Sequence, residues 1–216
     1  MDGDGTAMAN KRTLWGVGSS RALRGHWALI ELGLEYRSER IQSRSGETET
    51  PAYRRLNPRG KIPVLEDGPL VLSESAAIVT YLAETYGNGH LIPAGGAARA
   101  RYFEWISFIS MEIDATALYV LRRHEALAHI YGDAPAANAA ARGYFDRMIT
   151  AAARDIEDGR EYLLGPEFSG ADILMTTCLD WAVSYGIRVP EPWLAYLARA
   201  TARPAHARAV AANEVP

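Results

Sequence analysis

The segment from Asn57 to Tyr86, NPRGKIPVLEDGPLVLSESAAIVTYLAETY, constrains the fold of this chain more than any other stretch. Its β-rich run Ile62–Glu66 is followed by the turn dipeptide Asp67-Gly68 and by a second apolar run, Leu70–Leu72. After Ser73-Glu74-Ser75, apolar residues recur every four positions, which is typical of a helix. The segment therefore predicts a strand, a tight turn, a second strand and a helix.

Three features of this segment indicate a binding site. Pro63 stands where a strand begins, so the ladder groups of the neighbouring residue are left for a ligand. Lys61 is a cation beside it. Glu74 and Ser75 stand at a helix N-terminus, where free N–H groups and the helix dipole favour an anion. The pattern suits a small amino-acid-like or peptide ligand, with a carboxylate for Ser75 and Lys61 and an ammonium for Glu74.

The motif NPRGKIPVLEDG followed by LSESAAIVTYLAE resembles the glutathione-binding half of the cytosolic glutathione S-transferases, of the bacterial, serine-activated type. The resemblance is specific because several elements occur in the same order at matching separations. It extends from about Thr13 to Asn213 and is strongest in the first half. It implies the fold of that family: an α/β, thioredoxin-like N-terminal domain followed by an all-α C-terminal helical domain.

The residues of the first half predict a small mixed α/β domain without help from the resemblance. Residues 12–17 predict a strand, and Gly18-Ser19-Ser20-Arg21 predicts a turn that feeds a helix ending at Gly33. Residues 34–41 predict a second strand, which the β-α-β order makes parallel to the first, with a right-handed crossover. Residues 42–56 indicate a polar surface loop with one helical turn near its end.

Beyond a linker, strand signals disappear and the pattern predicts only helices. A long helix is indicated by the spacing of Tyr102, Ile106, Ile109 and Ile113. A Gly-Asp-Ala-Pro break separates it from an alanine-rich helix at about 137–157, and further helices are expected at about 173–185, 191–200 and 204–212. The predicted organisation is a disordered leader 1–11, a thioredoxin-like glutathione-binding domain 12–86, a linker 87–96 and an all-helical domain 97–216.

One helix start in the second half carries its own signal. Ser169-Gly170-Ala171-Asp172 resembles a capping box with aspartate in place of glutamate, so a helix is expected to open there.

Composition excludes several classes of function. Of 216 residues, 48% are hydrophobic and 23% charged, which is ordinary for a soluble globular protein, and the net charge of −3 indicates no nucleic-acid surface. The single cysteine, Cys178, excludes an internal disulfide framework and a cysteine-based metal cluster, and the histidines form no metal pattern. No run is long enough to span a membrane, and the first ten residues lack a signal-peptide pattern. The interpretation is a cytoplasmic protein without metal, nucleic acid or membrane.

The resemblance implies an activating hydroxyl at the end of the first strand. Counting back from Trp27-Ala28-Leu29 places it at Ser19, with Ser20 as the alternative. A hydroxyl that donates a hydrogen bond to sulfur favours the thiolate, which is the nucleophile. Arg21 is a further candidate for stabilising the thiolate or an anionic substrate. From position alone, Ser19 is a helix cap and Arg21 a solvated residue of the first turn.

Cysteine usage bears on the branch of the family. Some branches carry a cysteine near the position of Ser19 and use it for thiol–disulfide exchange, but residues 16–24 contain none. The Ser19-Ser20 pair resembles part of the serine-serine-cysteine motif of the zeta branch, and Arg21 replaces its cysteine, which weakens an isomerase interpretation. Cys178 lies in an apolar helical run and is interpreted as a core residue.

The resemblance also implies how glutathione is bound. The Ile62–Pro63 peptide bond is expected to be cis, with the backbone before the proline pairing with the cysteinyl part of glutathione. Ser75 would bind the γ-glutamyl carboxylate and Glu74 its ammonium. Lys61 would reach the glycyl carboxylate or stay solvated.

The function implied is that of a glutathione S-transferase, with glutathione as co-substrate and a small, mostly hydrophobic electrophile. The alternatives are a non-catalytic glutathione-binding or interaction protein on this fold, or peroxidase, dehalogenase or isomerase chemistry. A homodimer is expected from the family. Candidates for the electrophile pocket, each with an alternative role in the core or at a dimer contact, are Met111, Ala115, Leu118 and Tyr119.

Overall fold

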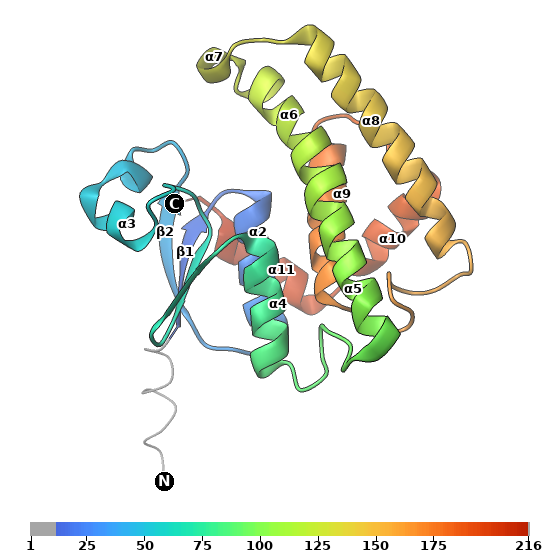
Figure 1. Ribbon diagram of the computed structural model, residues 1–216, viewed down its shortest axis with the longest axis horizontal. Coiled ribbons are helices and arrows are strands. Elements are labelled where there is room, and N and C mark those ends of the chain that lie inside the picture. Colours follow the sequence, from blue (N-terminus) through green and yellow to red (C-terminus); the bar gives the residue numbers. More distant parts are fainter. Residues whose placement is uncertain (1–11, 216) are drawn as a thin grey trace. The chain divides into compact units, whose positions relative to one another are not determined.

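The computed structural model describes residues 12–215 (Figure 1), so the predicted leader, residues 1–11, lies outside the described residues. The chain forms two compact units. Within the described residues, the first comprises residues 12–90 together with 202–215, and the second is Leu91–Thr201.

The first unit contains a four-stranded mixed sheet and the helices that cover it. Its elements are β1 (Arg12–Val17), α2 (Ser20–Glu31), β2 (Arg37–Gln42), η1 (Glu47–Glu49), α3 (Pro51–Leu56), β3 (Val64–Asp67), β4 (Leu70–Ser73), α4 (Ser75–Tyr86) and α11 (Pro204–Asn213).

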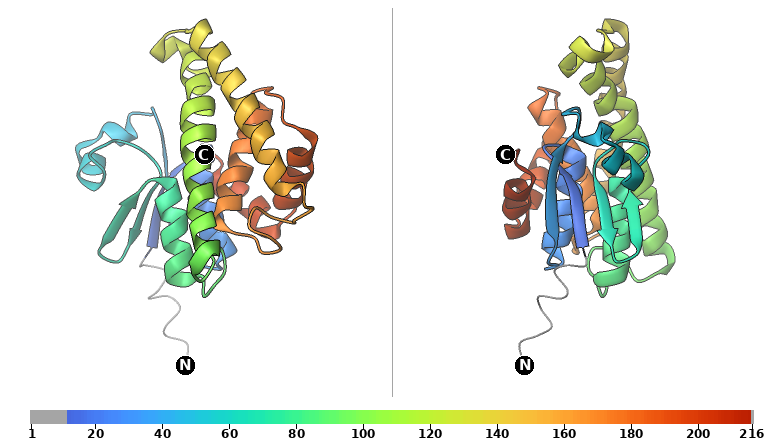
Figure 2. Two further views of the ribbon diagram at one scale, coloured as in Figure 1. Left: turned by 45° about the vertical axis from the view of Figure 1, so that its right-hand side comes forward. Right: turned by 90° about the vertical axis from the view of Figure 1, so that its left-hand side faces the viewer.

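The strand order is β2-β1-β3-β4, with β1 parallel to β2 and antiparallel to β3. The parallel pair confirms the predicted β-α-β unit. Helices α2 and α4 pack against each other, and α3 lies on the opposite side of the sheet (Figures 1 and 2). This arrangement is the thioredoxin-like layer that the family resemblance implied.

The β3–β4 hairpin turns one residue later than the sequence suggested. Asp67 is the last residue of β3 and pairs with Leu70, so the two loop residues are Gly68 and Pro69, and Gly68 has a φ of 59°. Glycine is favoured at the first loop position because it adopts positive φ without a steric cost. Asp67 stays in the strand because its carboxylate accepts hydrogen bonds from the Tyr81 and Tyr86 hydroxyls, at 2.9 and 2.5 Å.

Helix α2 is the centre of the first unit. It is buried from Ala22 to Leu29, because the sheet, α4 and α11 all contact it. Its Trp27 is fully buried and meets the His206 ring of α11 edge-on, with the ring centroids 4.7 Å apart. Glu31, at the end of α2, pairs with Arg203 just before α11. The predicted domain limits remain a prediction, and in the structure α11 belongs with the first unit through these contacts.

The second unit is helical throughout its regular elements. They are α5 (Gly96–Phe108), the π-helix η2 (Ile109–Leu118), α6 (Tyr119–Leu121), the π-helix η3 (Arg122–Ala126), α7 (Ala128–Tyr131), α8 (Pro135–Ala153), the 3₁₀ turn η4 (Arg154–Ile156), α9 (Gly170–Ser184) and α10 (Glu191–Thr201). The predicted long helix is therefore present, but its middle and end are wound as π-helix. Cys178 is fully buried in α9, which confirms its assignment to the core.

The predicted capping box opens α9. Asp172 is fully buried and accepts hydrogen bonds from the backbone N–H groups of Leu163 and Ser169, both at 2.8 Å. The hydroxyls of Ser169 and Tyr196 also donate to it, both at 2.6 Å. Burial raises the pKa of Asp172, and the hydrogen bonds that it accepts act against that rise. One carboxylate thus joins α9, α10 and the loop before α9.

Replacement of this carboxylate is expected to destabilise the protein strongly. Asp172→Ala leaves buried N–H groups and a buried tyrosine hydroxyl unsatisfied, so the free energy of unfolding should fall by about 3 kcal/mol or more. Asp180→Ala, on an exposed position of the same helix, is the matched control and should change it by less than about 0.5 kcal/mol. Urea unfolding measures both, and equal effects would contradict this role of Asp172.

Candidate functional site

Ser19 is the N-cap of α2. Its backbone is extended, with φ −146° and ψ 150°, and its Oγ accepts a hydrogen bond from the Ala22 N–H at 3.1 Å. This confirms the capping role, but the cap uses only a lone pair of the oxygen. No acceptor for the hydroxyl proton is found among the described residues. Ser19 can therefore cap the helix and donate to a ligand at the same time.

The neighbours of Ser19 are placed differently. Ser20 is the first residue of α2, and Arg21 follows it in the first turn; both are partly exposed. Only Ser19 has the N-cap geometry at the point where the strand β1 gives way to the helix.

A buried histidine, His26, forms a hydrogen bond to the backbone of Gly16, three residues before Ser19. A carbonyl oxygen can only accept, so the contact of 3.1 Å between His26 Nε2 and the Gly16 oxygen requires the proton on Nε2. Nδ1 then accepts from the Tyr36 hydroxyl at 2.7 Å. Burial lowers the pKa of His26 to about 4, and burial raises the pKa of Tyr36 to about 12. The pair is therefore a neutral, fixed support for Gly16.

Gly16 brings the end of β1 against Ile62. Its φ is +118°, and a Cβ added there would lie 2.6 Å from the Ile62 Cβ, closer than real side chains approach. Only glycine fits here, because other residues rarely adopt this positive φ and because a side chain would clash with Ile62. This contact places the Ile62–Pro63 bond beside the turn that leads to Ser19.

The Ile62–Pro63 peptide bond is cis, as predicted. The preceding carbonyl, that of Lys61, accepts from the Tyr53 hydroxyl at 2.7 Å and from Asn57 Nδ2 at 2.8 Å. The N–H and C=O of Ile62 have no hydrogen-bond partner among residues 12–215, so they are available to an extended ligand backbone. The Lys61 side chain is exposed, and the described part of the chain offers it no ion-pair partner.

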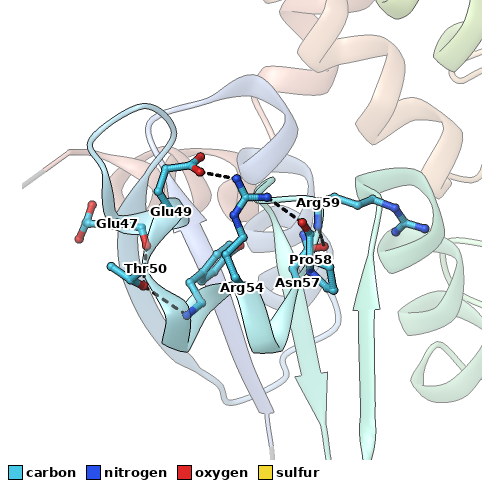
Figure 3. A network of polar contacts seen from close by, with 8 residues as sticks. Glu47, Glu49, Thr50, Arg54, Asn57, Pro58 and Arg59 are labelled. Carbon is cyan, nitrogen blue, oxygen red and sulfur yellow. Dashed lines mark hydrogen bonds and ion pairs between the residues drawn. The ribbon is translucent and has the colours of Figure 1, made fainter.

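A polar network holds the loop that precedes Lys61. Figure 3 shows the Arg54 side chain reaching from α3 to Glu49 on one side and to the Pro58 carbonyl on the other, where the hydrogen bond is 2.7 Å. Asn57 accepts from the Arg59 N–H at 3.2 Å through its Oδ1. The loop is thus fixed by its own side chains before it reaches the cis bond.

The junction between β4 and α4 has the features expected of an anion site. Glu74 has a φ of 73°, a strained conformation for a residue with a side chain, and such residues cluster at functional sites. No side chain caps α4, so the N–H groups of its first turn are left for a ligand. The Glu74 side chain is exposed and has no partner among the described residues. Ser75 is buried, and its Oγ accepts from Arg24 Nη1 at 3.2 Å.

Arg24 links the two halves of this arrangement, and the sequence reasoning missed it. It lies on α2, only 2% exposed, and bonds to the first residue of α4. The bond uses a lone pair of Ser75 and leaves the serine hydroxyl proton to donate to a carboxylate. No local signal marks it in the sequence, because an arginine on a helix is ordinarily exposed and its partner, Ser75, lies 51 residues along the chain.

The structure therefore brings most of the predicted site residues into one region of the first unit. The Gly16 contact joins the cis-proline loop to the Ser19 turn, and Arg24 joins α2 to Ser75. The candidates for the electrophile pocket lie in the second unit, and their role stays a prediction. Met111 is 60% exposed, Ala115 is exposed, Tyr119 is half-buried and Leu118 is fully buried. Three of them are in η2, and π-helical turns occur frequently at functional sites.

Residues 12–215 contain neither a membrane-spanning helix nor a metal-binding cluster. None of the helices there is both long and apolar enough to cross a membrane. Within the same residues, no three His, Cys, Asp or Glu side chains are grouped so that they could hold a metal ion.

Comparison with known proteins identifies the family. Residues 18–85 match the family described as "Glutathione S-transferase, N-terminal domain", and residues 135–204 match "Glutathione S-transferase, C-terminal domain". Glutathione S-transferase GST-4.5 of Xanthomonas campestris is 30% identical over 142 residues, which is 64% of this chain and 68% of that protein. This chain belongs to the glutathione S-transferase family.

Two further relatives match nearly the whole length of this chain. A probable maleylacetoacetate isomerase of Vibrio cholerae is 29% identical over 205 residues, 91% of this chain and 93% of that protein. The crystal structure of a theta class glutathione S-transferase from Xanthomonas axonopodis, with glutathione bound, is 31% identical and superposes with a TM-score of 0.76 over 93% of this chain and 97% of that chain. The family and the fold inferred from the sequence are thereby confirmed.

The buried His26 should make stability sensitive to acid. Its pKa of about 4 lies below the ordinary 6.5, so the unfolded chain binds the proton more tightly. Above about pH 6.5 this histidine leaves the free energy of unfolding at its full value. As the pH falls toward 4, proton uptake by the unfolded chain lowers that free energy by about 3 kcal/mol.

Urea unfolding over that pH range tests this expectation. His26→Gln should remove this component of the pH dependence, whereas His90→Gln, at an exposed position, should keep it. Parallel pH dependences for the wild type and His26→Gln would show that His26 is not the group responsible.

Proposed function

We propose that this protein is a glutathione transferase that activates the thiol of reduced glutathione through the hydroxyl of Ser19. The observation that carries the proposal is the hydrogen bonding of that hydroxyl. Its oxygen caps α2 at 3.1 Å from the Ala22 N–H, while its proton lacks an acceptor among the described residues. The same turn lies against the cis-proline loop, whose Ile62 backbone groups are unpaired there.

Each part of glutathione finds a complementary group in this proposal. The unpaired N–H and C=O of Ile62 pair with the cysteinyl residue as an added strand. The γ-glutamyl carboxylate binds the hydroxyl of Ser75 and the uncapped N-terminus of α4, and the exposed Glu74 carboxylate binds the ammonium. Lys61 is exposed beside the loop, in reach of solvent, and serves the glycyl carboxylate.

The chemistry follows from the ionisation of the thiol. The thiol proton passes to solvent, and Ser19 donates a hydrogen bond to the resulting thiolate. A hydrogen bond to a charged group contributes about 1.5–3 kcal/mol, which corresponds to about one to two units of thiol pKa. The thiolate then attacks an electrophilic carbon, a carbon–sulfur bond forms, and the electron pair of the broken bond leaves with the displaced group. Holding both substrates together supplies the rest of the acceleration.

Several finer assignments belong to the same proposal. The electrophile is small and mostly hydrophobic and is bound with the help of Met111, Ala115, Leu118 and Tyr119. Arg21 assists an anionic substrate or the thiolate. The protein acts in the cytoplasm as a homodimer, with glutathione as a co-substrate and without a metal. The support for these statements is membership of the family and the chemistry of the residues.

A second activity has a specific observation in its favour. The similarity to the probable maleylacetoacetate isomerase of Vibrio cholerae covers more than nine-tenths of both chains. A glutathione-dependent isomerase activity would use the same first-unit site. Because Arg21 stands where the zeta-type motif has a cysteine, conjugation is the preferred activity, and maleylacetoacetate belongs in the substrate panel.

Removal of the Ser19 hydroxyl tests the mechanism. Ser19→Ala should lower kcat about tenfold to a hundredfold and move the pH profile of kcat/KM upward by one to two units, because the thiolate loses its hydrogen-bond donor. Glutathione affinity should change little. Ser19→Thr keeps the hydroxyl and the cap, and Ser20→Ala keeps Ser19, so both should retain the low thiol pKa.

The measurements are steady-state conjugation against a panel of electrophiles and ultraviolet titration of the bound thiolate. A Ser19→Ala variant with an unchanged pH profile would disprove activation by this residue. Glutathione binding by the wild type without turnover of any electrophile, peroxide or maleylacetoacetate would favour a non-catalytic binding protein instead.

The γ-glutamyl assignment makes a separate prediction. Glu74→Gln removes the charge that faces the ligand ammonium, so the affinity for glutathione should fall about tenfold while kcat at saturation changes little. Glu84→Gln, at an exposed position near the other end of α4, is the control and should leave the affinity unchanged. Isothermal titration calorimetry measures both, and equal affinities for wild type and Glu74→Gln would refute the assignment.

A further inference from the structure

The end of α11 is hydrogen-bonded to the turn that carries Ser19. The Gly18 N–H donates to the Asn213 carbonyl at 2.8 Å, and the Asn213 amide Nδ2 donates to the Ser19 carbonyl at 3.2 Å. These partners lie almost two hundred residues apart in the sequence. The geometry of the turn therefore depends on a distant segment as well as on β1 and α2.

The Ser19 carbonyl receives two hydrogen bonds, one from each side. Leu23 N donates to it at 2.9 Å, as the first bond of α2, and Asn213 Nδ2 supplies the second. A carbonyl oxygen has two lone pairs, so both are used and the peptide plane after Ser19 is fixed. Because this plane and the Ser19 dihedral angles set the direction of the Cα–Cβ bond, they also aim the hydroxyl.

Asn213 can act in this way because its own segment is anchored. Arg40 of β2 donates to the Glu214 carbonyl at 2.5 Å and to the Ala212 carbonyl at 3.5 Å, on either side of Asn213. A Cβ added at Gly18 would lie 2.7 Å from Val215 Cγ2, so the segment packs directly on the turn. Asn213 Oδ1 is buried and has no partner among the described residues, so the amide is bonded through its nitrogen.

We propose that Asn213 is a positioning residue for the thiol-activating hydroxyl of Ser19. This inference rests on the proposed function of Ser19 and adds a residue from the opposite end of the described chain to it. Asn213 does not touch the ligand in this proposal. It holds the carbonyl of the residue whose hydroxyl does, in the orientation that points the hydroxyl proton at the sulfur.

A merely structural role for Asn213 predicts something different. An amide that only secures the end of α11 would change the free energy of unfolding, with the pH profile of the reaction unmoved. A positioning role changes the ionisation of bound glutathione at temperatures where the variant is fully folded. The two roles are therefore separated by the pH profile of kcat/KM.

The test is a double-mutant cycle between Asn213 and Ser19. Asn213→Ala should lower kcat about fivefold to tenfold, as expected for one lost hydrogen bond, and move the pH profile upward. In the Ser19→Ala background the same substitution should have no further effect on kcat, because the group that it positions is absent. Arg208→Ala, at an exposed position of α11, is the control and should leave kcat unchanged.

A second variant tests the inference independently, in case Asn213→Ala does not fold. Arg40→Ala removes the hydrogen bonds to the Ala212 and Glu214 carbonyls while Asn213 and Ser19 themselves stay unchanged, and it should lower kcat about twofold to threefold. Urea unfolding accompanies every variant. An equal loss from Asn213→Ala with and without the Ser19 hydroxyl, or an unmoved pH profile, would overturn the inference. An unaffected Ser19→Ala enzyme would instead overturn the proposed function.

Discussion

The close approach of Gly16 to Ile62 is the constraint on which the candidate site depends. Because no Cβ intervenes, the end of β1 and the residue before the cis proline lie in contact, and the Ser19 turn follows directly. His26 donates a hydrogen bond to the Gly16 carbonyl as a neutral imidazole. A charged imidazolium would be poorly tolerated there, since burial disfavours it. The turn that carries Ser19 is thus supported by a group that is uncharged at neutral pH.

Most of the fold could be predicted from the sequence, because strands, helix ends and caps are local. The periodicity after Ser75, the glycine at position 33 and the capping box before α9 each carry their own signal. The supports of the site could not be predicted. Arg24 and His26 read as ordinary positions of a helix, and their partners, Ser75 and the Gly16 carbonyl, become neighbours only when the sheet and α4 are in place. No sequence signal marks Gly16, because the residue that a Cβ there would clash with, Ile62, lies far along the chain.

The site also departs from the local rules that the rest of the chain obeys. Ser169 and Asp172 form a capping box at the start of α9, whereas α4 begins at a strained Glu74 with no side-chain cap. An uncapped first turn and a positive φ both reduce stability. Such a local loss is understandable where the unsatisfied groups are needed for a ligand. The exposed Glu74 carboxylate and Lys61 ammonium fit the same explanation.

Capping and thiol activation are compatible roles for Ser19, although they look like competing interpretations in the sequence. The cap requires an acceptor, and the Ala22 N–H takes one lone pair of the oxygen. Activation requires a donor, and the proton of the same hydroxyl supplies it. Accepting a hydrogen bond polarises the O–H group and strengthens it as a donor, so the two bonds reinforce each other. A serine at a helix N-cap is therefore suited to stabilising an anion, provided that the backbone keeps its proton aimed outward.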